Sequence, residues 1–261
     1  MAESPELPEL ASAVCETWLD EIDRTSPGLV TGLHVRGGIG FGEFVPGRSD
    51  VDFVAILSRR PSMTDEELIE AAHAATNGLR PDVPFDGLHL LEEDLAADPD
   101  DCPDVPCVLH GYFEAAARYD LSPVAWHELA GHSVTVRGTL PEVWTDHDRL
   151  LDFTRTTLRT DWRSSAEALA RFPAEAETEH SCEWGVLGVA RLHHLLVTGE
   201  MTAKSAAGTW GLGHYDEHFH RVIREALRIR AGGPDSEYDD PAARGRDTAE
   251  FTAYVVNEAG A

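Results

Sequence analysis

The chain has 261 residues, 42% of them hydrophobic, which allows one large domain or two small ones with a sizeable core. Its formal charge of −26 opposes binding to a nucleic acid backbone and favours a cationic ligand, although an acidic surface that only maintains solubility explains the charge equally well. The first thirty residues contain no apolar run of signal-peptide or membrane-span length. We therefore expect a cytoplasmic monomer with neither a nucleic acid nor a membrane partner.

Four cysteines, at positions 15, 102, 107 and 182, form neither a C-x-x-C pair nor another metal-binding spacing. This spacing favours free thiols in a reducing compartment over a disulfide framework. Structural zinc is not expected.

The first half of the chain alternates helical and strand patterns. Residues 10–22 predict a helix, because apolar side chains recur every four positions from Leu10 onward. Residues 31–36 predict a strand that leads into glycines. Residues 50–57 (DVDFVAIL) predict a second, buried strand.

The next segment predicts a helix, a turn and a third strand. Thr64 is a candidate N-cap with Glu67 three positions later, and the helical pattern continues to residue 75. Asn-Gly and two prolines in residues 77–84 predict a turn, and residues 85–91 (FDGLHLL) predict a short strand.

From about residue 148 the pattern becomes helical. Residues 149–170, 183–197 and 215–230 each have helical periodicity, and the loop expected at residues 232–245 precedes a last short helix. We therefore predict an α+β fold, with a small mixed-sheet domain over residues 1–140 and an all-helical domain over residues 141–261.

A glycine pair followed by two spaced aspartates is the strongest local signal. Gly37 and Gly38 precede a turn-rich segment, after which Ser49 leads into Asp50 and Asp52. Residues two apart on a strand point to the same face, so the two carboxylates lie side by side. Mg²⁺ relieves their repulsion and keeps coordination sites for phosphate oxygens, while paired glycines let the backbone approach a triphosphate.

A third carboxylate, Asp86 on the next expected strand, is the best candidate to complete this site. It would share the metal, or take a proton from an attacking hydroxyl while the metal neutralises charge at the α-phosphorus. Glu92 and Glu93 are second choices, because they lie where the chain leaves the strand for a helix.

Two other interpretations of these residues stay open. The aspartates and glycines would form an ordinary strand start and loop in a protein without this chemistry. A dinucleotide-binding fold is the other alternative, although Glu43 occupies the position of the last glycine in G-x-G-x-x-G.

The glycine pair, loop and Asp-x-Asp strand resemble the signature of polymerase-beta-type nucleotidyltransferases. From residue 34 to residue 230 the chain also resembles the aminoglycoside adenylyltransferases that modify streptomycin and spectinomycin. The stretches that carry the resemblance are HVRGGIGFGEFVPGRSDVDFVAIL (34–57), GHSVTVRG (131–138) and LGVARLHHLLVTGEMTAKSAAGTWGL (187–212). This family implies a nucleotidyltransferase domain followed by a helical domain that binds substrate and nucleotide.

The resemblance implies ATP and Mg²⁺ as cofactors. Asp50 and Asp52 match the aspartate pair that binds the metal in the family, and Gly38 and Ser49 fall at phosphate-contacting positions.

Arg191 and Lys204 match the basic residues with which the family's helical domain holds the nucleotide. The match is physically reasonable, because an otherwise acidic chain must bring positive charge to a triphosphate. His193 and His194 on the same expected helix are interpreted as packing or surface residues.

The chain departs from the family pattern in three places. Gly38 stands where the signature often has serine, so a hydroxyl is lost, although backbone amides would still bind phosphate. Asp86 stands in place of a catalytic glutamate and is one methylene shorter. Phe172 and Glu177 align with a tryptophan and an aspartate of streptomycin-modifying members, which leaves the identity of the drug open.

Substrate binding is expected near an acidic run in the helical half. Phe172, Glu177, Glu183 and Trp184 are the candidates, with Trp184 as a stacking surface beside the run. A solvated face is the more frequent meaning of such a run.

A histidine-based metal site is a weaker hypothesis. His214 and His218 are one turn apart on an expected helix, but HYDEH lacks the HExxH pattern and no third ligand is evident.

The residues and the resemblance together predict an ATP- and Mg²⁺-dependent adenylyltransferase. It would move AMP to a hydroxyl of an aminoglycoside-type antibiotic of the spectinomycin or streptomycin class, a small cationic substrate. Two alternatives stay open, namely nucleotidyl transfer to another metabolite or protein, and nucleotide binding without catalysis.

Overall fold

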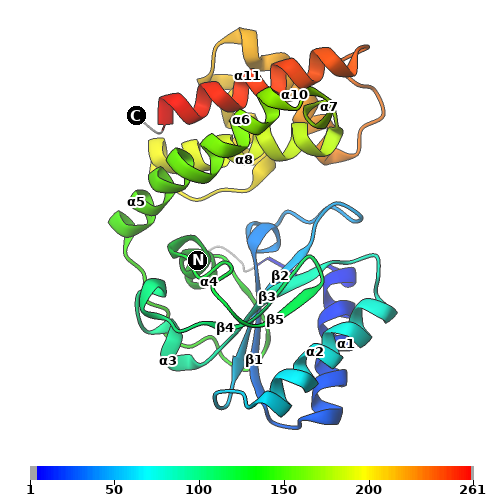
Figure 1. The fold of residues 1–261 in the computed structure, drawn as a ribbon, viewed down its shortest axis with the longest axis vertical. Coiled ribbons are helices and arrows are strands. Elements are labelled where there is room, and N and C mark those ends of the chain that lie inside the picture. Colours follow the sequence, from blue (N-terminus) through cyan, green and yellow to red (C-terminus); the bar gives the residue numbers. More distant parts are fainter. Residues whose placement is uncertain (1–4, 260–261) are drawn as a thin grey trace. The chain divides into compact units, whose positions relative to one another are not determined.

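A computed structural model describes residues 5–259, and the chain divides into two compact units, Met1–Asp146 and His147–Ala261 (Figure 1). The first unit contains a six-stranded mixed sheet and the second is helical. The predicted α+β class is therefore confirmed.

The first unit contains the three strands that the sequence predicts and three more. In chain order its helices and strands are α1 (Glu9–Thr25), β1 (Val30–Arg36), β2 (Val51–Leu57), α2 (Met63–Leu79), β3 (Phe85–Leu90), α3 (Glu92–Leu95), β4 (Val105–Leu109), β5 (Tyr112–Ala117), α4 (Pro123–Gly131) and β6 (Val134–Arg137). Short 3₁₀ helices span Gly37–Phe41 and Pro99–Asp101.

The sheet has the strand order β5-β4-β3-β2-β1-β6. Strands β2 and β3 pair in parallel, and the other four pairings are antiparallel. The α2 helix connects the two parallel strands, as a parallel pairing requires. The carboxyl-bearing starts of β2 and β3 therefore lie at the same edge of the sheet.

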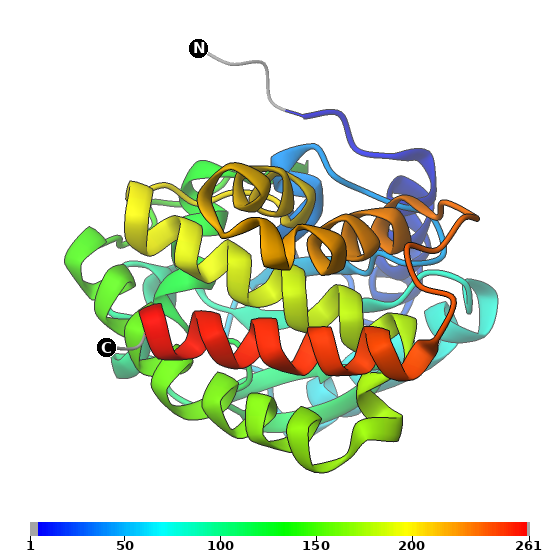
Figure 2. The same cartoon turned by 90° about the horizontal axis from the view of Figure 1, so that it is seen from above.

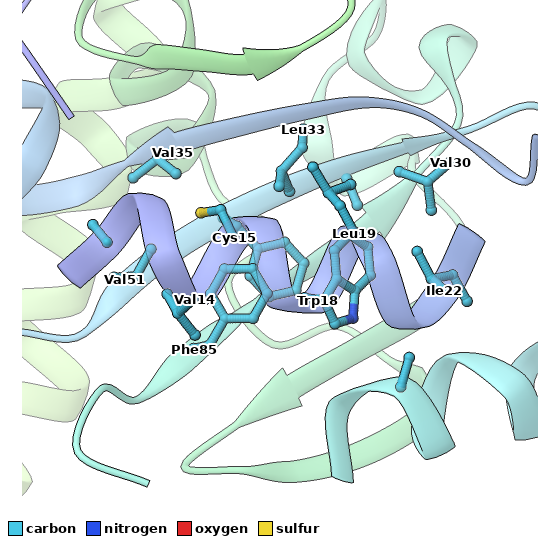
Figure 3. Packing of buried hydrophobic residues seen from close by; sticks show 14 of the residues in the cluster. Val14, Cys15, Trp18, Leu19, Ile22, Val30, Leu33, Val35, Val51 and Phe85 are labelled. Atoms are coloured by element: carbon cyan, nitrogen blue, oxygen red, sulfur yellow. The ribbon is translucent and has the colours of Figure 1, made fainter. Parts of the chain in front are cut away.

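Two apolar cores cover the two faces of the sheet. One face packs against α1 and α2, and Figure 3 shows Val14, Cys15, Trp18 and Leu19 of α1 directed at this face. The other face packs against α3 and α4 through residues such as Trp126. Burial on both sides explains why β2 is almost continuously apolar after Asp52, with no polar residue on alternate positions.

Buried histidines are a second feature of the α1 and α2 core. His73 Nε2 lies 3.1 Å from His89 Nε2, and His89 Nδ1 lies 3.0 Å from the carbonyl oxygen of Pro106. The Trp18 ring packs on both imidazoles. Burial lowers the pKa of His89 to about 4 and lowers the pKa of His73 well below its ordinary value.

The start and end of α2 differ from the prediction. The N-cap is Ser62, which forms a capping box with Asp65, so the assignment of Thr64 and Glu67 to these roles is wrong. Asp65 also binds the Arg59 guanidinium, which strengthens the earlier start. The helix ends at Leu79, so the first residues of the turn expected at 77–84 are helical.

The second unit consists of helices around one core. They are α5 (His147–Thr157), a π-helical segment (Leu158–Trp162), α6 (Arg163–Arg171), α7 (Pro173–Ala176), α8 (Glu179–Thr198), α9 (Lys204–His214), a 3₁₀ turn (Glu217–Phe219), α10 (His220–Ala231) and α11 (Pro241–Ala259). α8 contacts α9, α10 and α11, and Figure 2 shows α11, in red, alongside α8.

The prediction of one helix over residues 215–230 is wrong. α9 ends at His214, and Tyr215, which follows it, has an extended backbone. The side chain of Asp216 then caps a separate 3₁₀ turn, after which α10 begins at His220. The last helix, expected to be short, has 19 residues and begins at Pro241, inside the expected loop.

A buried ion cluster fixes the loop between α10 and α11. Glu225 is fully buried and accepts hydrogen bonds from Arg228 Nε at 2.9 Å, Arg244 Nη1 at 3.2 Å and Ser236 Oγ at 2.8 Å. The backbone amide of Glu237 donates to the same carboxylate. Burial alone would raise the pKa of Glu225, but the hydrogen bonds, led by that from Arg228, outweigh it and hold the pKa at about 2.

Two further expectations concern the whole chain. All four cysteines are free thiols with buried side chains, as their spacing predicts. Within residues 5–259, none of the helices combines the length and apolar character needed to cross a bilayer.

Candidate functional site

The predicted carboxylates lie together at one edge of the sheet. Asp52 on β2 is the register partner of Asp86 on the parallel strand β3, so their side chains point to the same face. Asp50 immediately precedes β2 and is two residues from Asp52. The structure therefore places Asp52 beside Asp86, with Asp50 at the start of the same strand as Asp52.

Arg36 extends this row of charged residues to a third strand. It is the register partner of Asp52 on β1, and its side chain is 4% exposed. Its guanidinium pairs with Asp120 and, through Nη1 at 2.6 Å, with Glu128 Oε2 on α4. Burial would lower the pKa of Arg36, but Glu128 and then Asp52 outweigh burial and raise it.

The glycine pair forms a tight turn directly against Asp52. Gly37 has a φ of +64°, and a Cβ at this position would lie 2.1 Å from Asp52 Oδ2. A Cβ on Gly40 would lie 1.7 Å from the carbonyl oxygen of His132, and the Phe41 ring stacks on His132 at 4.2 Å. Glycine is therefore required at 37 and 40, because the turn touches both β2 and the end of α4.

Ser49 closes the loop that precedes the aspartates. Its Oγ accepts a hydrogen bond from the amide of Val45 at 3.0 Å, and its own amide donates to the Val45 carbonyl at 2.9 Å. The side chain is 7% exposed. Its predicted contact with phosphate stays a prediction.

Asp86 is held by the turn between β4 and β5. Its Oδ2 accepts a hydrogen bond from the amide of His110 at 2.9 Å, and its Oδ1 accepts one from the amide of Gly111 at 3.2 Å. Both turn residues have positive φ, 52° and 76°, as a two-residue hairpin turn of this kind needs. The carboxylate is thereby fixed in orientation, and Asp86 is 4% exposed.

Tyr119 belongs to this group, and neither it nor Arg36 follows from the sequence motif. The tyrosine lies between β5 and α4, is 41% exposed, and interacts electrostatically with Asp52, Arg36, Asp86 and Asp50. Burial, followed by the charge of Asp52, raises its pKa to about 12. Its neighbour Asp120 pairs with Arg36, so the backbone at Tyr119 lies next to this row of charged residues.

The carboxylates suit a cation that keeps part of its coordination for water and phosphate. Asp50 is exposed and Asp52 is partly exposed, and hard oxygen donors of this type are what Mg²⁺ prefers. Across residues 5–259, no group of three or more histidine, cysteine or acidic side chains could hold a metal ion. A metal-binding role for the aspartates stays a prediction.

The predicted nucleotide-binding basic residues belong to the second unit. Arg191 lies on α8 and Lys204 is the first residue of α9, and both side chains are partly buried. Their role in binding the nucleotide stays a prediction.

The predicted substrate residues of the second unit have different surroundings. Phe172 is 48% exposed, and Trp184 is 37% exposed with its ring stacked on Trp162 at 4.3 Å. Glu183 is buried and pairs with Arg230 at 3.0 Å. Glu177 ends α7, and its carbonyl oxygen accepts hydrogen bonds from the Arg244 guanidinium.

The histidine-based metal hypothesis is not supported, because each histidine has a separate partner. His214 stacks on Trp210, His218 Nε2 lies 3.1 Å from Glu250 Oε1, and His220 Nε2 lies 3.1 Å from the Tyr215 carbonyl.

Comparisons with known proteins agree with this architecture. Residues 157–258 match the family described as "Aminoglycoside adenylyltransferase, C-terminal domain". The fold is similar to the crystal structure of spectinomycin adenyltransferase AAD(9) from Enterococcus faecialis with ATP and spectinomycin, with a TM-score of 0.67 at 12% sequence identity, over 94% of this chain and 98% of that one. No curated protein sequence matches the chain. The helical half of the chain, at residues 157–258, is therefore similar to the C-terminal domain of aminoglycoside adenylyltransferases.

Proposed function

We propose that this protein is an ATP-dependent adenylyltransferase that moves AMP to a hydroxyl group of an aminoglycoside-type antibiotic of the spectinomycin or streptomycin class. The observation that carries the proposal is the pairing of Asp52 with Asp86 on adjacent parallel strands, next to the Gly37 turn. The family of the helical half and the fold shared with a spectinomycin adenyltransferase support the same activity.

The reaction assigns a separate task to each group of residues. The acceptor oxygen forms a bond to the α-phosphorus of ATP, and the bond from that phosphorus to the oxygen that bridges the α- and β-phosphates breaks. The hydroxyl proton passes to the carboxylate of Asp86, whose orientation the amides of His110 and Gly111 maintain. Pyrophosphate leaves with the electrons of the broken bond.

The nucleotide requires positive charge that the acidic first unit lacks. Asp50 and Asp52 would hold Mg²⁺, which neutralises phosphate charge when it is bound. Arg191 and Lys204 would contact the triphosphate, since a guanidinium and an ammonium group both bind phosphate oxygens. Gly37, Gly38 and Ser49 would provide close backbone and hydroxyl contacts to it.

The acceptor is a small cationic molecule in this proposal. Phe172 and Trp184 expose aromatic surface that suits the apolar face of a sugar ring. Glu177 contributes negative charge in the same unit, whereas the carboxylate of Glu183 is paired with Arg230. The formal charge of −26 favours approach of a polycation.

The direct test is a panel of acceptors incubated with ATP and Mg²⁺. We expect spectinomycin or streptomycin to gain the mass of one AMP while pyrophosphate is released, and chelation of Mg²⁺ to stop the reaction. A cell lysate serves as a separate acceptor arm. Labelling of lysate components without labelling of any drug would reject the antibiotic as substrate and retain the nucleotidyl transfer.

The site itself is tested by Asp52→Asn, which keeps the size of the side chain and removes its charge. We expect a loss of about a hundredfold or more in turnover, as for removal of one charge-stabilising group. The control is Asp101→Asn, an exposed carboxylate of the same unit. Full activity of Asp52→Asn at an unchanged melting temperature would remove the carboxylate from the mechanism.

A further inference from the structure

The C-terminal end of α4 holds the 3₁₀ turn Gly37–Phe41, called here the glycine turn, from both of its ends. Directly before the turn, Arg36 Nη1 binds Glu128 Oε2 at 2.6 Å. At the end of the turn, the Phe41 ring stacks on the His132 ring, with centroids 4.2 Å apart and 27° between the ring planes. The His132 amide donates a hydrogen bond to the Glu128 carbonyl at 2.7 Å, so both holding residues belong to one helical turn.

Between these two points the glycine turn lies directly on the end of the helix. A Cβ on Gly40 would lie 1.7 Å from the carbonyl oxygen of His132, so backbone packs against backbone. Within the turn, the amide of Gly42 donates to the carbonyl of Ile39 at 2.9 Å. Internal hydrogen bonding therefore maintains the shape of the turn, whereas the contacts with α4 determine its place.

α4 is itself firmly packed. Trp126 and Leu129 are fully buried in the core on this face of the sheet, and Trp126 Nε1 donates a hydrogen bond to the carbonyl of Ala97 at 3.2 Å. The side chain of Ser122 caps the other end of the helix by accepting a hydrogen bond from the amide of Ala125. A site supported by a packed helix keeps its geometry more precisely than one on an unsupported loop.

The place of the glycine turn matters for any ligand that its backbone binds. The backbone of a glycine-rich turn reaches phosphate oxygens through amide groups, and such hydrogen bonds weaken steeply when distance or angle departs from a narrow range. A turn released from the helix would still bind phosphate, but with poorer geometry and an additional ordering cost.

We propose that Glu128 and His132 are positioning residues that hold the glycine turn in place for the triphosphate of ATP. Glu128 acts through Arg36, which precedes the turn, and His132 acts through Phe41, which ends it. The inference rests on the proposed function, because it concerns the ATP site of the same AMP transfer. It adds two residues that lie outside both the glycine turn and the Asp-x-Asp strand.

His132→Ala tests one end of this support, because it removes the stacked ring and keeps the backbone contact with Gly40. We expect the Kd of Mg²⁺–ATP, measured by isothermal titration calorimetry, to rise about tenfold, as for loss of one aromatic pair. The KM of the acceptor should stay nearly unchanged. His132→Phe keeps a stacked ring and should restore tight binding of ATP.

The matched control is His127→Ala, at a histidine of the same helix. Its Nδ1 lies 2.8 Å from the carbonyl oxygen of Pro123, within α4 itself. We expect the Kd of Mg²⁺–ATP to stay the same in this variant. A purely structural role of His132 would reduce the amount of binding-competent protein in His132→Ala and leave the Kd of that protein unchanged.

Glu128→Gln tests the other end of the support. It keeps the size of the side chain and removes the charge that holds Arg36, so the Kd of Mg²⁺–ATP should rise here too. Hydrogen exchange measures the turn without any nucleotide, and the amides of residues 37–42 should exchange faster in Glu128→Gln and His132→Ala than in the unchanged protein. An unchanged Kd in both variants would overturn the inference.

The two proposals fail in different ways. If the unchanged protein binds ATP but adenylylates no acceptor, the proposed function fails, and the Kd values still decide whether α4 positions the glycine turn. If AMP transfer occurs and both variants bind ATP as tightly as the unchanged protein, the inference fails while the transfer activity stands. If the unchanged protein does not bind ATP, both proposals fail.

Discussion

The two units contain buried charge clusters of opposite composition. In the first unit one guanidinium, Arg36, pairs with the two carboxylates of Asp120 and Glu128. In the second unit one carboxylate, Glu225, pairs with the two guanidinium groups of Arg228 and Arg244. Both central side chains are almost completely buried.

The difference lies in what each cluster holds in place. Arg36 is the register partner of Asp52 and pairs with the residue next to Tyr119, so its cluster is connected to the carboxylate site. Glu225 binds Ser236 and the amide of Glu237, so its cluster fixes a connecting loop. The buried ion cluster of the first unit thus lies next to the candidate site, whereas that of the second unit fixes a connecting loop.

The largest expected effect is on stability, from Glu225→Gln. Loss of the charge leaves the guanidinium groups of Arg228 and Arg244 buried without their carboxylate, which costs about 3–5 kcal/mol of unfolding free energy. Urea denaturation followed by circular dichroism measures the loss. Asp152→Asn, which breaks an exposed pair with Arg155, is the control and should change stability by less than about 1 kcal/mol. Equal effects of the two substitutions would contradict a special role for the buried cluster.

Acid should weaken the first unit more than the second. Burial lowers the pKa of His34 and His89 to about 4 and that of His73 well below its ordinary value, whereas in the second unit it lowers the pKa of His193, also to about 4.

The sign of this effect follows from proton uptake. Below the ordinary histidine pKa of about 6.5 the unfolded chain binds protons that the folded chain does not, so stability is full above that pH and falls as the pH decreases toward 4. Two additional histidines predict an extra loss of about 2–3 kcal/mol in the first unit between pH 7 and 5.5. Hydrogen exchange followed by mass spectrometry, with the rates corrected for the intrinsic exchange rate at each pH, measures the stability of each unit separately. An equal response of both units would contradict the comparison.

The smallest effects are expected from a matched pair of glycine substitutions. Gly188→Ala places a Cβ 2.4 Å from the Trp162 ring, which should cost about 1–2 kcal/mol of stability and leave AMP transfer nearly unchanged. Gly37→Ala places a Cβ against the Asp52 carboxylate. We expect it to raise the activation free energy of AMP transfer by more than it lowers the free energy of unfolding. Gly213→Ala, with open space around the new methyl group, is the control. Thermal unfolding and the AMP-transfer assay separate the two outcomes.

Much of the fold follows from local patterns. The four-residue spacing of apolar side chains identified α1, and the apolar run after Asp50 identified β2, because both patterns are long and regular. β5 was missed, since its sequence, YFEAAA, does not alternate apolar and polar residues. The break at Tyr215 was also missed, because Asp216 caps a 3₁₀ turn inside a segment with helical periodicity.

The candidate site was predictable only along single strands. Alternation on one strand is enough to place Asp50 beside Asp52, and Asp86 was added from the next strand in the sequence. Arg36 and Tyr119 depend on strand register and on the path of the chain after β5, which no local pattern determines. Arg36 is recognisable only when β1 is aligned with β2, and Tyr119 only when the chain after β5 is traced to the pair of Asp120 and Arg36.

The hairpin turn at His110 and Gly111 has a consequence for protein engineering. It holds Asp86 through two backbone amides, and the His110 imidazole, although 81% exposed, also has its Nδ1 4.0 Å from Asp86 Oδ2. A library that randomises residue 110 would therefore keep both amide hydrogen bonds to Asp86 only in members whose new residue accepts the positive φ of this position. Lengthening the hairpin by one residue would move both amides away from Asp86, so the turn is constrained in its length as well as in its backbone conformation.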